Sequence, residues 1–171
     1  MSLHVVLVHP EIHWNTGNAG RTCLATGATL HLVEPLGFSL DEKQVKRAGL
    51  DYWPALELSL HATAEDFLAE RAQRGGRLLG FSSHAKHSYD AVAFSADDWL
   101  LFGCESDGLS ERVLHQADVC LTIPMPGNIL GSDHPGVRSL NLSVSVAVGL
   151  YEALRQLKQL DPPSPDAQKM E

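Results

Sequence analysis

Short apolar runs recur along the chain and predict the strands of a buried β-sheet. Residues 3–8 form a valine-rich run, and residues 29–33 form a second one. About 20 residues separate the two runs, enough for one helix over residues 17–28, so the chain opens with a β-α-β unit typical of a parallel sheet. Three later runs end at Gly, Ser, Pro or Asp and are further strand candidates: Arg77–Phe81, Trp99–Phe102 and Val119–Ile123.

Three other stretches have the features of helices. Asp41 can cap a basic helix that runs to about Ala48, and a second helix is expected from Thr63 or Ala64 to Ala72. From Asn141 to about Leu160 one apolar stripe recurs at helical spacing. Alternating valines at the start of that segment also suit a strand, but its length favours a helix. The stripe comprises Leu142, Val146, Leu150, Ala153, Leu154 and Leu157.

The chain shows no internal repeat and no linker between domains. We therefore expect one α/β domain with a parallel sheet over residues 1–160. Residues 124–138 are rich in Gly and Pro and are expected to form a loop. The tail, residues 161–171, contains three prolines and is expected to be disordered.

The composition is that of a soluble globular protein, with 44% hydrophobic and 20% charged residues among 171. No apolar run approaches the roughly 20 residues that span a membrane, and the N-terminus lacks an export signal, so a cytoplasmic location is expected. The three cysteines, Cys23, Cys104 and Cys120, match no zinc or redox spacing. Each is expected to be a buried free thiol.

The net charge of −8 argues weakly against a nucleic-acid partner, because RNA-binding proteins usually show an excess of basic residues. Positive charge is concentrated in two clusters, and the simplest interpretation of both is a solvated helix face. The clusters are Lys43, Lys46 and Arg47, and Arg71, Arg74 and Arg77.

Three segments near predicted strand ends have residue choices that packing does not explain, and that edge of an open α/β sheet is where ligands bind. The first is Asn-Thr-Gly-Asn-Ala-Gly-Arg, residues 15–21. It could expose backbone N–H groups at a helix start, with Arg21 in the first turn to bind a phosphate. Taken alone, an asparagine-capped helix with a surface arginine explains it better.

The second segment, residues 101–109, runs from a strand into Gly103, then Glu105, then another glycine. Gly103 would permit close approach of a flat ligand, and Glu105 could bind that ligand or fix the neighbouring loop; a polar turn with a helix cap explains the segment equally well. In the third, Ile123 ends a strand, and Ser139 and Asn141 precede a very apolar helix. Each of these two polar residues could also be a simple cap.

A metal site is not expected. His84 and His87 could face one way on a helix and chelate a metal ion, but the sequence offers no third ligand nearby. A solvated loop is the better interpretation of this pair.

In their order, the three segments resemble the SPOUT RNA methyltransferases. The matching motifs are Pro-Glu-Ile with Asn-Thr-Gly-Asn and Arg21, Leu-Phe-Gly-x-Glu-x-x-Gly, Ile-Pro-Met, and Ser-Leu-Asn-Leu-Ser-x-Ser-Val-Ala. The sequence is most similar to the small single-domain branch that 2′-O-methylates cytidine or uridine at the tRNA wobble position, and segments 34–38, 47–52 and 151–153 also match it. The resemblance covers about residues 5–157. It departs from close relatives in residues 127–136, where the loop is longer, and at Cys104, where proline is common.

The resemblance implies a parallel-sheet α/β domain whose C-terminal part is tied in a deep trefoil knot, an obligate homodimer, and S-adenosyl-L-methionine (AdoMet) as cofactor. By position, the family's AdoMet contacts fall on Phe81, Gly103, Ile123 and Ser139. Its catalytic and RNA-binding residues fall on Arg21, Glu105, Ser139 and Asn141, with Arg21 acting from the other subunit.

The reaction implied is transfer of the AdoMet methyl group to a tRNA ribose 2′-OH. We expect Arg21 to bind the adjacent phosphate and steady the developing alkoxide, because a guanidinium holds its proton too tightly to act as a base. Two alternatives stay open: a ribosomal RNA 2′-O-methyltransferase, and a non-catalytic dimer that binds AdoMet or RNA.

Overall fold

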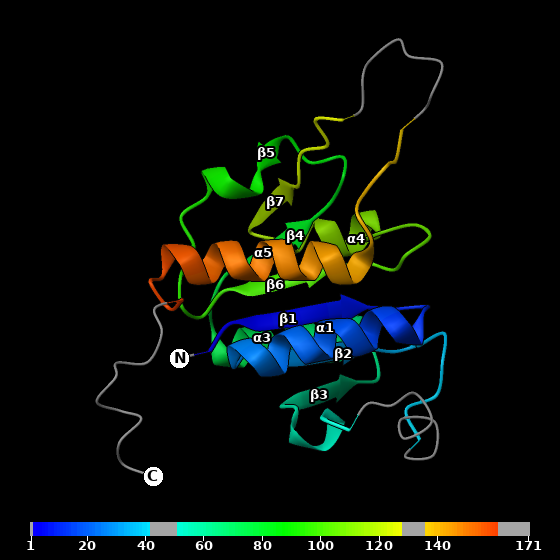
Figure 1. The fold of residues 1–171 in the computed structure, drawn as a ribbon. Helices are drawn as coiled ribbons and strands as arrows, with labels where there is room; N and C mark the ends of the chain where they lie inside the picture. The colour runs from blue at the N-terminus through cyan, green and yellow to red at the C-terminus, as the bar shows by residue number, and fades with distance from the viewer. Residues whose placement is uncertain (1, 42–50, 128–135, 161–171) are drawn as a thin grey trace, which may run out of the picture.

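The fold is built on one seven-stranded, entirely parallel β-sheet. The computed structural model describes residues 2–41, 51–127 and 136–160. The strand order is β3-β2-β1-β6-β4-β7-β5, so β1 and β6 lie near the middle (Figure 1). The strands are β1 (His4–Val8), β2 (Thr29–Val33), β3 (Leu58–His61), β4 (Leu78–Phe81), β5 (His87–Ser88), β6 (Trp99–Phe102) and β7 (Val119–Thr122).

The parallel sheet and five of its strands are confirmed at their predicted positions, to within one residue at each end. The sequence did not predict β3 and β5, the two edge strands. β3 is only partly buried and β5 is two residues long, so neither forms the continuous apolar run that a central parallel strand requires.

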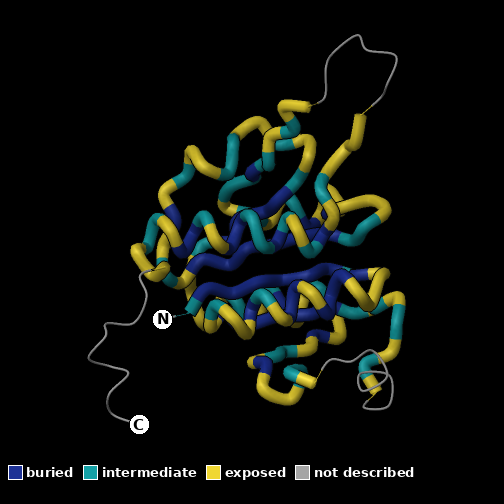
Figure 2. Tube along the Cα trace, in the orientation of Figure 1, coloured by how far each residue is buried: buried dark blue, intermediate teal, exposed yellow. Residues whose placement is uncertain are grey.

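Helices cover both faces of the sheet. On one face α1 (His13–Thr26) and α5 (Leu142–Gln156) lie side by side, and α3 (Ala64–Arg74) and α4 (Glu111–Leu114) cover the other (Figure 1). The sheet's centre is buried from both sides, while exposed and buried residues alternate along α1 and α5 (Figure 2). Two apolar cores result, one on each face.

Two of the helix predictions are confirmed and one is wrong at its start. The Thr63 side chain caps α3, and the Asn141 side chain caps α5. The segment after Asn141, for which a strand was the alternative, is therefore a helix. α1, however, begins at His13 and not at Gly17. The helix expected from Asp41 to Ala48 lies largely outside the described residues, as does the tail from 161 to 171. Within the described segments, no helix is long and apolar enough to cross a bilayer.

The prediction of three buried thiols holds for one cysteine. Cys23 lies on the buried side of α1, in the core, and burial raises the pKa of its thiol to about 12. Cys104 and Cys120 are partly exposed. Cys104 lies in the turn after β6, and Cys120 lies on β7, which has only the two-residue β5 beside it at that edge.

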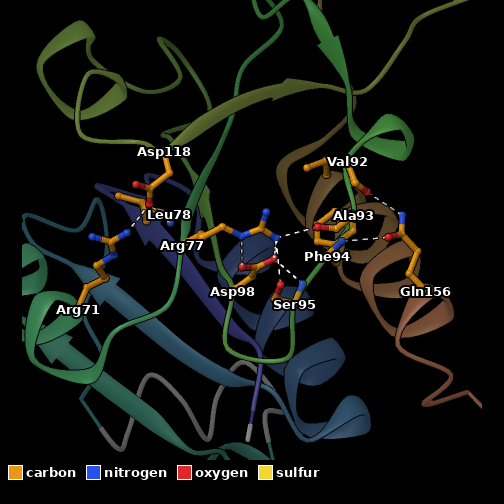
Figure 3. A network of polar contacts seen from close by, with 10 residues as sticks. All are labelled: Arg71, Arg77, Leu78, Val92, Ala93, Phe94, Ser95, Asp98, Asp118 and Gln156. Atoms are coloured by element: carbon orange, nitrogen blue, oxygen red, sulfur yellow. Dashed lines mark hydrogen bonds and ion pairs between the residues drawn. The ribbon is translucent and has the colours of Figure 1, made fainter.

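Hydrogen bonds and ion pairs of two aspartates connect the amino ends of three adjacent strands (Figure 3). The Arg77 guanidinium, just before β4, donates two hydrogen bonds to the buried Asp98 carboxylate, just before β6, at 2.9 and 2.6 Å. Asp118, before β7, accepts from the Leu78 N–H at 2.7 Å and pairs with Arg71. Because Asp98 is fully buried, this pairing is needed to offset the cost of removing its charge from water.

The expected solvated face of Arg71, Arg74 and Arg77 is therefore wrong for Arg77, which precedes a strand and is fixed by Asp98. Arg74 pairs with Glu70 on the same helix. All three arginines of the cluster thus have acidic partners, so the cluster offers little unpaired positive charge to a polyanion.

Three histidines form a hydrogen-bonded row, here called the histidine ladder, inside the core on the α3 side. His4 Nδ1 lies 3.0 Å from His31 Nε2, and His31 Nδ1 lies 3.0 Å from His61 Nε2. The row ends at Glu70, 3.7 Å from His61 Nδ1, and Trp99 stacks on His4 with ring centroids 3.9 Å apart. Burial lowers the pKa of all three, that of His31 to about 3, where its neighbours His4, His61 and Arg74 add to the effect.

The ladder predicts loss of stability in mild acid. In the unfolded chain a histidine binds its proton near pH 6.5, whereas folded His31 does so only near pH 3. Between these values the unfolded state binds more protons, so the free energy of unfolding falls as the pH drops below about 6.5. At pH 5 the expected loss from His31 is about 2 kcal/mol, at about 1.4 kcal/mol per pH unit. Urea unfolding at pH 7 and pH 5 measures it.

Two variants separate this effect from the titration of carboxylates. His31→Gln should unfold at lower urea than the parent at pH 7 but lose less stability between pH 7 and pH 5. His84→Gln, at an exposed position, should keep the parent's full loss. An unchanged pH dependence in His31→Gln would contradict the assignment.

Candidate functional site

The segments singled out in the sequence converge on one edge of the sheet. β6, β4 and β7 are adjacent and parallel, so their carboxyl ends lie together. Phe81 ends β4, Gly103 follows β6, and Ile123 follows β7. The structure thus brings together three of the four residues expected to contact a cofactor. The fourth, Ser139, is exposed and lies two residues before the cap of α5.

Phe81 provides an apolar wall at this edge. Its ring stacks on that of Phe102, with centroids 4.5 Å apart and an angle of 19° between their planes. α5 approaches so closely that a Cβ at Gly149 would lie 2.8 Å from Phe81 Cζ. Phe81 is 8% exposed, so its ring lies almost wholly in the core beneath this edge, and the backbone after β4 lies at the edge.

Gly103 is required by the turn that follows it. A Cβ at this position would lie 1.9 Å from the carbonyl carbon of Gly108. The two segments are this close because the loop turns back on itself, with backbone pairing between Cys104 and Gly108 as an isolated antiparallel β-bridge. We expected the glycine to make room for a ligand. The structure shows instead that the loop's own backbone fills that space.

Glu105 caps helix α1 from a different loop. Its carboxylate accepts hydrogen bonds from the backbone N–H groups of Glu11 and Ile12, at 2.7 and 3.1 Å, and from Asn15 Nδ2 at 3.0 Å. The α1 N-cap residue, Ile12, has no side chain able to do this. A carboxylate at this end also interacts favourably with the helix dipole. Of the alternatives left open for Glu105, fixing the neighbouring loop is confirmed.

The contact between the two loops is reciprocal. The Glu11 carboxylate accepts hydrogen bonds from the Ser106 N–H at 2.9 Å and from the Ser106 hydroxyl at 2.8 Å. Each loop therefore supplies a carboxylate to the backbone of the other. Such charge-assisted bonds are stronger than neutral ones and hold the two loops in register.

Asn15 links Glu105 to Asn141, although no local pattern in the sequence distinguishes it from the other polar residues of its segment. Its Nδ2 donates to Glu105, and its Oδ1 accepts from Asn141 Nδ2 at 2.9 Å. Asn141 Oδ1 accepts in turn from the Ser143 N–H and hydroxyl. One chain of amides and carboxylate thus joins the β6 loop, α1 and α5. Asn15 is 6% exposed, so each amide orientation is fixed by its partners.

Arg21 lies apart from this chain of hydrogen bonds. We expected Arg21 in the first turn of a helix, but α1 begins eight residues earlier, so Arg21 is exposed in the middle of the helix. It is therefore far from the backbone N–H groups at the helix start that could bind an anion. Six residues separate it from Asn15, about 9 Å along a helix axis. Its guanidinium lies 5.7 Å from the centre of the Tyr52 ring, whose hydroxyl bonds the Gly17 carbonyl.

The described residues contain no group of three or more His, Cys, Asp or Glu side chains that could hold a metal ion. His84 lies in a turn and His87 on the edge strand β5; both are exposed. The helix considered for this pair is therefore absent.

The sequence matches that of a known protein family. A family model described as the SpoU rRNA methylase family matches residues 2–151. The chain belongs to this family. The SPOUT resemblance is thereby confirmed, and the α/β-knot fold class is confirmed by the solved structures of SpoU methylases that share this fold.

Several SpoU methylases of this size are similar along nearly their whole length. The tRNA (cytidine(34)-2′-O)-methyltransferase of Polaromonas sp. is 44% identical over 153 residues, which cover 90% of each chain. Its counterpart in Burkholderia ambifaria is 43% identical and covers 90% of this chain and 94% of the relative.

Solved structures agree with the sequence comparison. A structure concerned with the 2-OH methylation of C/U34 on tRNA is 48% identical, with a TM-score of 0.81 over 92% of this chain and 97% of that chain. An AdoMet-bound rRNA methyltransferase from Sinorhizobium meliloti is 25% identical, with a TM-score of 0.76. It is matched over 91% of this chain but only 57% of its own, so it contains substantial additional sequence.

The central position of Asn15 predicts a charge-specific effect on stability. Asn15→Asp replaces the donor to Glu105 with a second carboxylate, so repulsion adds to the lost hydrogen bond. We expect the free energy of unfolding at pH 7 to fall by roughly 2–3 kcal/mol, as for a buried polar group that loses its partner. Urea unfolding would measure this change.

Asn18→Asp is the matched control, because Asn18 is an exposed residue one turn further along α1. It should change stability by less than about 0.5 kcal/mol. Equal losses in the two variants would show that Asn15 does not hold Glu105.

Proposed function

We propose that this chain is an AdoMet-dependent methyltransferase acting on the ribose 2′-OH of the wobble cytidine or uridine, nucleotide 34, of tRNA. The main support is identity of 43–48% over about 90% of the chain to proteins described by that activity or substrate. The hydrogen-bonded chain from Glu105 through Asn15 to Asn141 supports the same conclusion, because it joins two residues expected in catalysis. A tRNA substrate also fits the cytoplasmic location expected from the sequence.

The edge formed by β6, β4 and β7 suits the adenosine part of AdoMet. It combines the buried Phe81 ring and the half-buried Ile123 with strand-end backbone groups at one sheet edge, where flat ligands bind in open α/β folds. The residues that would hold the cofactor are Phe81, Gly103 and Ile123, through their strand-end backbone, and Ser139. When bound, AdoMet supplies a methyl group already activated by a sulfonium.

The protein's own contribution is then mainly positional. Glu105 and Asn141 are held by fixed hydrogen bonds, so the loops that carry them change little when substrate binds. The planar donor fork of a guanidinium suits Arg21 to bind the phosphate beside the reacting ribose and to stabilise the alkoxide as it forms. The 2′-OH proton would pass to that phosphate or to water. Ser139, near the edge, would contact the ribose or the cofactor.

Arg21 reaches such a site only if a second copy of the chain supplies it. α1 and α5 lie side by side, and each presents an exposed apolar side chain: Trp14 on α1 is 61% exposed and Tyr151 on α5 is 47% exposed. Arg21 lies seven residues after Trp14, about two helical turns, so both are on the same side of α1. Tyr151 and Val144 are related in the same way on α5. Pairing two copies through this face would bury the apolar side chains and bring Arg21 toward the partner's site. We therefore include a homodimer in the proposal.

The dimer predicts a specific effect of charge at this face. Trp14→Glu should give a folded monomer by light scattering at micromolar concentration, since a carboxylate would be desolvated in the interface. It should also lose most methyl transfer, because Arg21 is no longer supplied across the pair.

Leu60→Glu is the control for added charge on an exposed apolar residue. Leu60 is 51% exposed on the edge strand β3, away from α1 and α5. This variant should keep both the dimer and the activity. A monomeric parent protein with full activity would overturn the assignment of Arg21 to the partner site.

The function itself is tested by incubating the dimer with labelled AdoMet and total tRNA and mapping the methylated ribose. We expect label at nucleotide 34 only. Label in ribosomal RNA instead would identify the alternative substrate, and label in no RNA would favour a binding protein without catalysis.

Arg21→Lys, assayed in parallel, should turn over about a hundredfold more slowly, because lysine keeps the charge but cannot donate two parallel hydrogen bonds. Near-normal turnover would contradict the role given to the guanidinium fork.

A further inference from the structure

A cavity lies at the same edge of the sheet as the candidate site, but on the opposite face from α1 and α5. Its volume is about 510 Å³, within the range of small-molecule sites. It is bounded by the ends of β1, β2 and β3 and by helices α3 and α4, so it spans the point where the strand order reverses beside β1. None of the residues expected at the methyl-transfer site lines it.

His9 lines this cavity in an unusual backbone conformation. Its φ is +53°, in the left-handed region that residues other than glycine seldom adopt. Val8 packs on the α3 side, so strand alternation would direct His9 toward α1, and the left-handed turn reverses this direction. Its buried Nδ1 atom has no hydrogen-bond partner within the described part of the chain. The strained backbone conformation that turns His9 into the cavity lining is typical of ligand-binding sites.

Glu34 lines the same cavity from the neighbouring strand end. Val8 pairs with Val33 in the β1–β2 register, and the His9 N–H donates a hydrogen bond to the Val33 carbonyl at 3.0 Å. His9 and Glu34, the residues that follow these two, are therefore neighbours at the ends of adjacent strands. The Glu34 carboxylate forms no hydrogen bond or ion pair with the described residues. Pro35, Leu68 and Val113 add apolar walls.

These groups are complementary to an amino-bearing nucleobase. Guanine presents its O6 acceptor beside the N1–H and N2–H donors, so His9 can donate to O6 while Glu34 accepts two parallel N–H bonds. Cytosine and adenine offer a carboxylate only one amino group at that edge. Uracil would place a carbonyl oxygen against the carboxylate. Unstacked bases of single-stranded RNA are recognised by such contacts at their hydrogen-bonding edges.

We propose that the cavity lined by His9, Glu34 and Leu68 binds an unstacked, amino-bearing base of the RNA, guanine in preference to the others. This inference rests on the proposed function, because it takes the ligand to be part of the RNA substrate. It adds a contact that selects RNA sequence at a distance from the methylated ribose.

Binding of short RNA tests the preference directly. Calorimetry with the parent dimer and the single-stranded trinucleotides ApGpA, ApCpA and ApUpA should show guanine bound most tightly and uracil least, by roughly tenfold or more. Guanosine 5′-monophosphate alone should bind more weakly than ApGpA; tighter binding of the mononucleotide would identify a free-nucleotide site. Equal affinity for all three trinucleotides would overturn the proposal.

Two variants locate the site. Glu34→Gln should remove the guanine preference, and Leu68→Trp should fill the cavity and weaken all three trinucleotides. In the methylation assay both should raise KM for tRNA about tenfold and leave kcat and AdoMet affinity unchanged. Glu111→Gln, on α4 but outside the cavity, is the matched control and should match the parent.

The two proposals can fail independently. If no RNA is methylated but Glu34→Gln still abolishes the preference for ApGpA, the cavity stands and the proposed reaction does not. If nucleotide 34 is methylated and Glu34→Gln keeps the parent's KM and base preference, the cavity proposal is wrong.

Discussion

The arrangement of the site depends on one carboxylate, that of Glu105. It is placed at the bare amino end of α1, where backbone N–H groups would otherwise lack partners, and it is held there by three donors. The β6 loop is thereby fixed to α1, and Asn15 extends the connection to α5. Segments roughly 90 to 130 positions apart in the chain are joined through a few polar atoms. The helices that carry the exposed apolar face are positioned by the same contacts.

The sequence was informative where one segment's residues determine its structure and less so where distant segments meet. The central strands were predictable because burial on both faces makes them continuously apolar. The start of α1 was misplaced because Gly17 and Gly20 indicate a turn in isolation. In the structure a Cβ at Gly20 would lie 2.9 Å from the Trp53 ring, so glycine is needed there for close packing within a helix. No local pattern contains that requirement.

The candidate site shows the same division. Motif order was sufficient to identify the family and to select Glu105 and Asn141, but it could not show that Asn15 joins them, since their hydrogen bonds exist only after the sheet has assembled. The basic clusters were harder still to interpret. Arg71 and Arg77 belong to the network that fixes the amino ends of the strands, so net charge was a poor guide to which cations are available to RNA.

The histidine ladder has a consequence beyond its effect on acid stability. A neutral imidazole has one donor and one acceptor nitrogen, so three rings in a row must all point their protons the same way. Glu70 favours a proton on His61 Nδ1. His61 Nε2 then accepts from His31 Nδ1, and His31 Nε2 accepts from His4 Nδ1. The tautomer of His4, which stacks on Trp99 near the middle of the sheet, is therefore set by a carboxylate on α3 that contacts β3, two strands away. Without the Glu70 charge, this preference for one direction of the protons along the row would be lost.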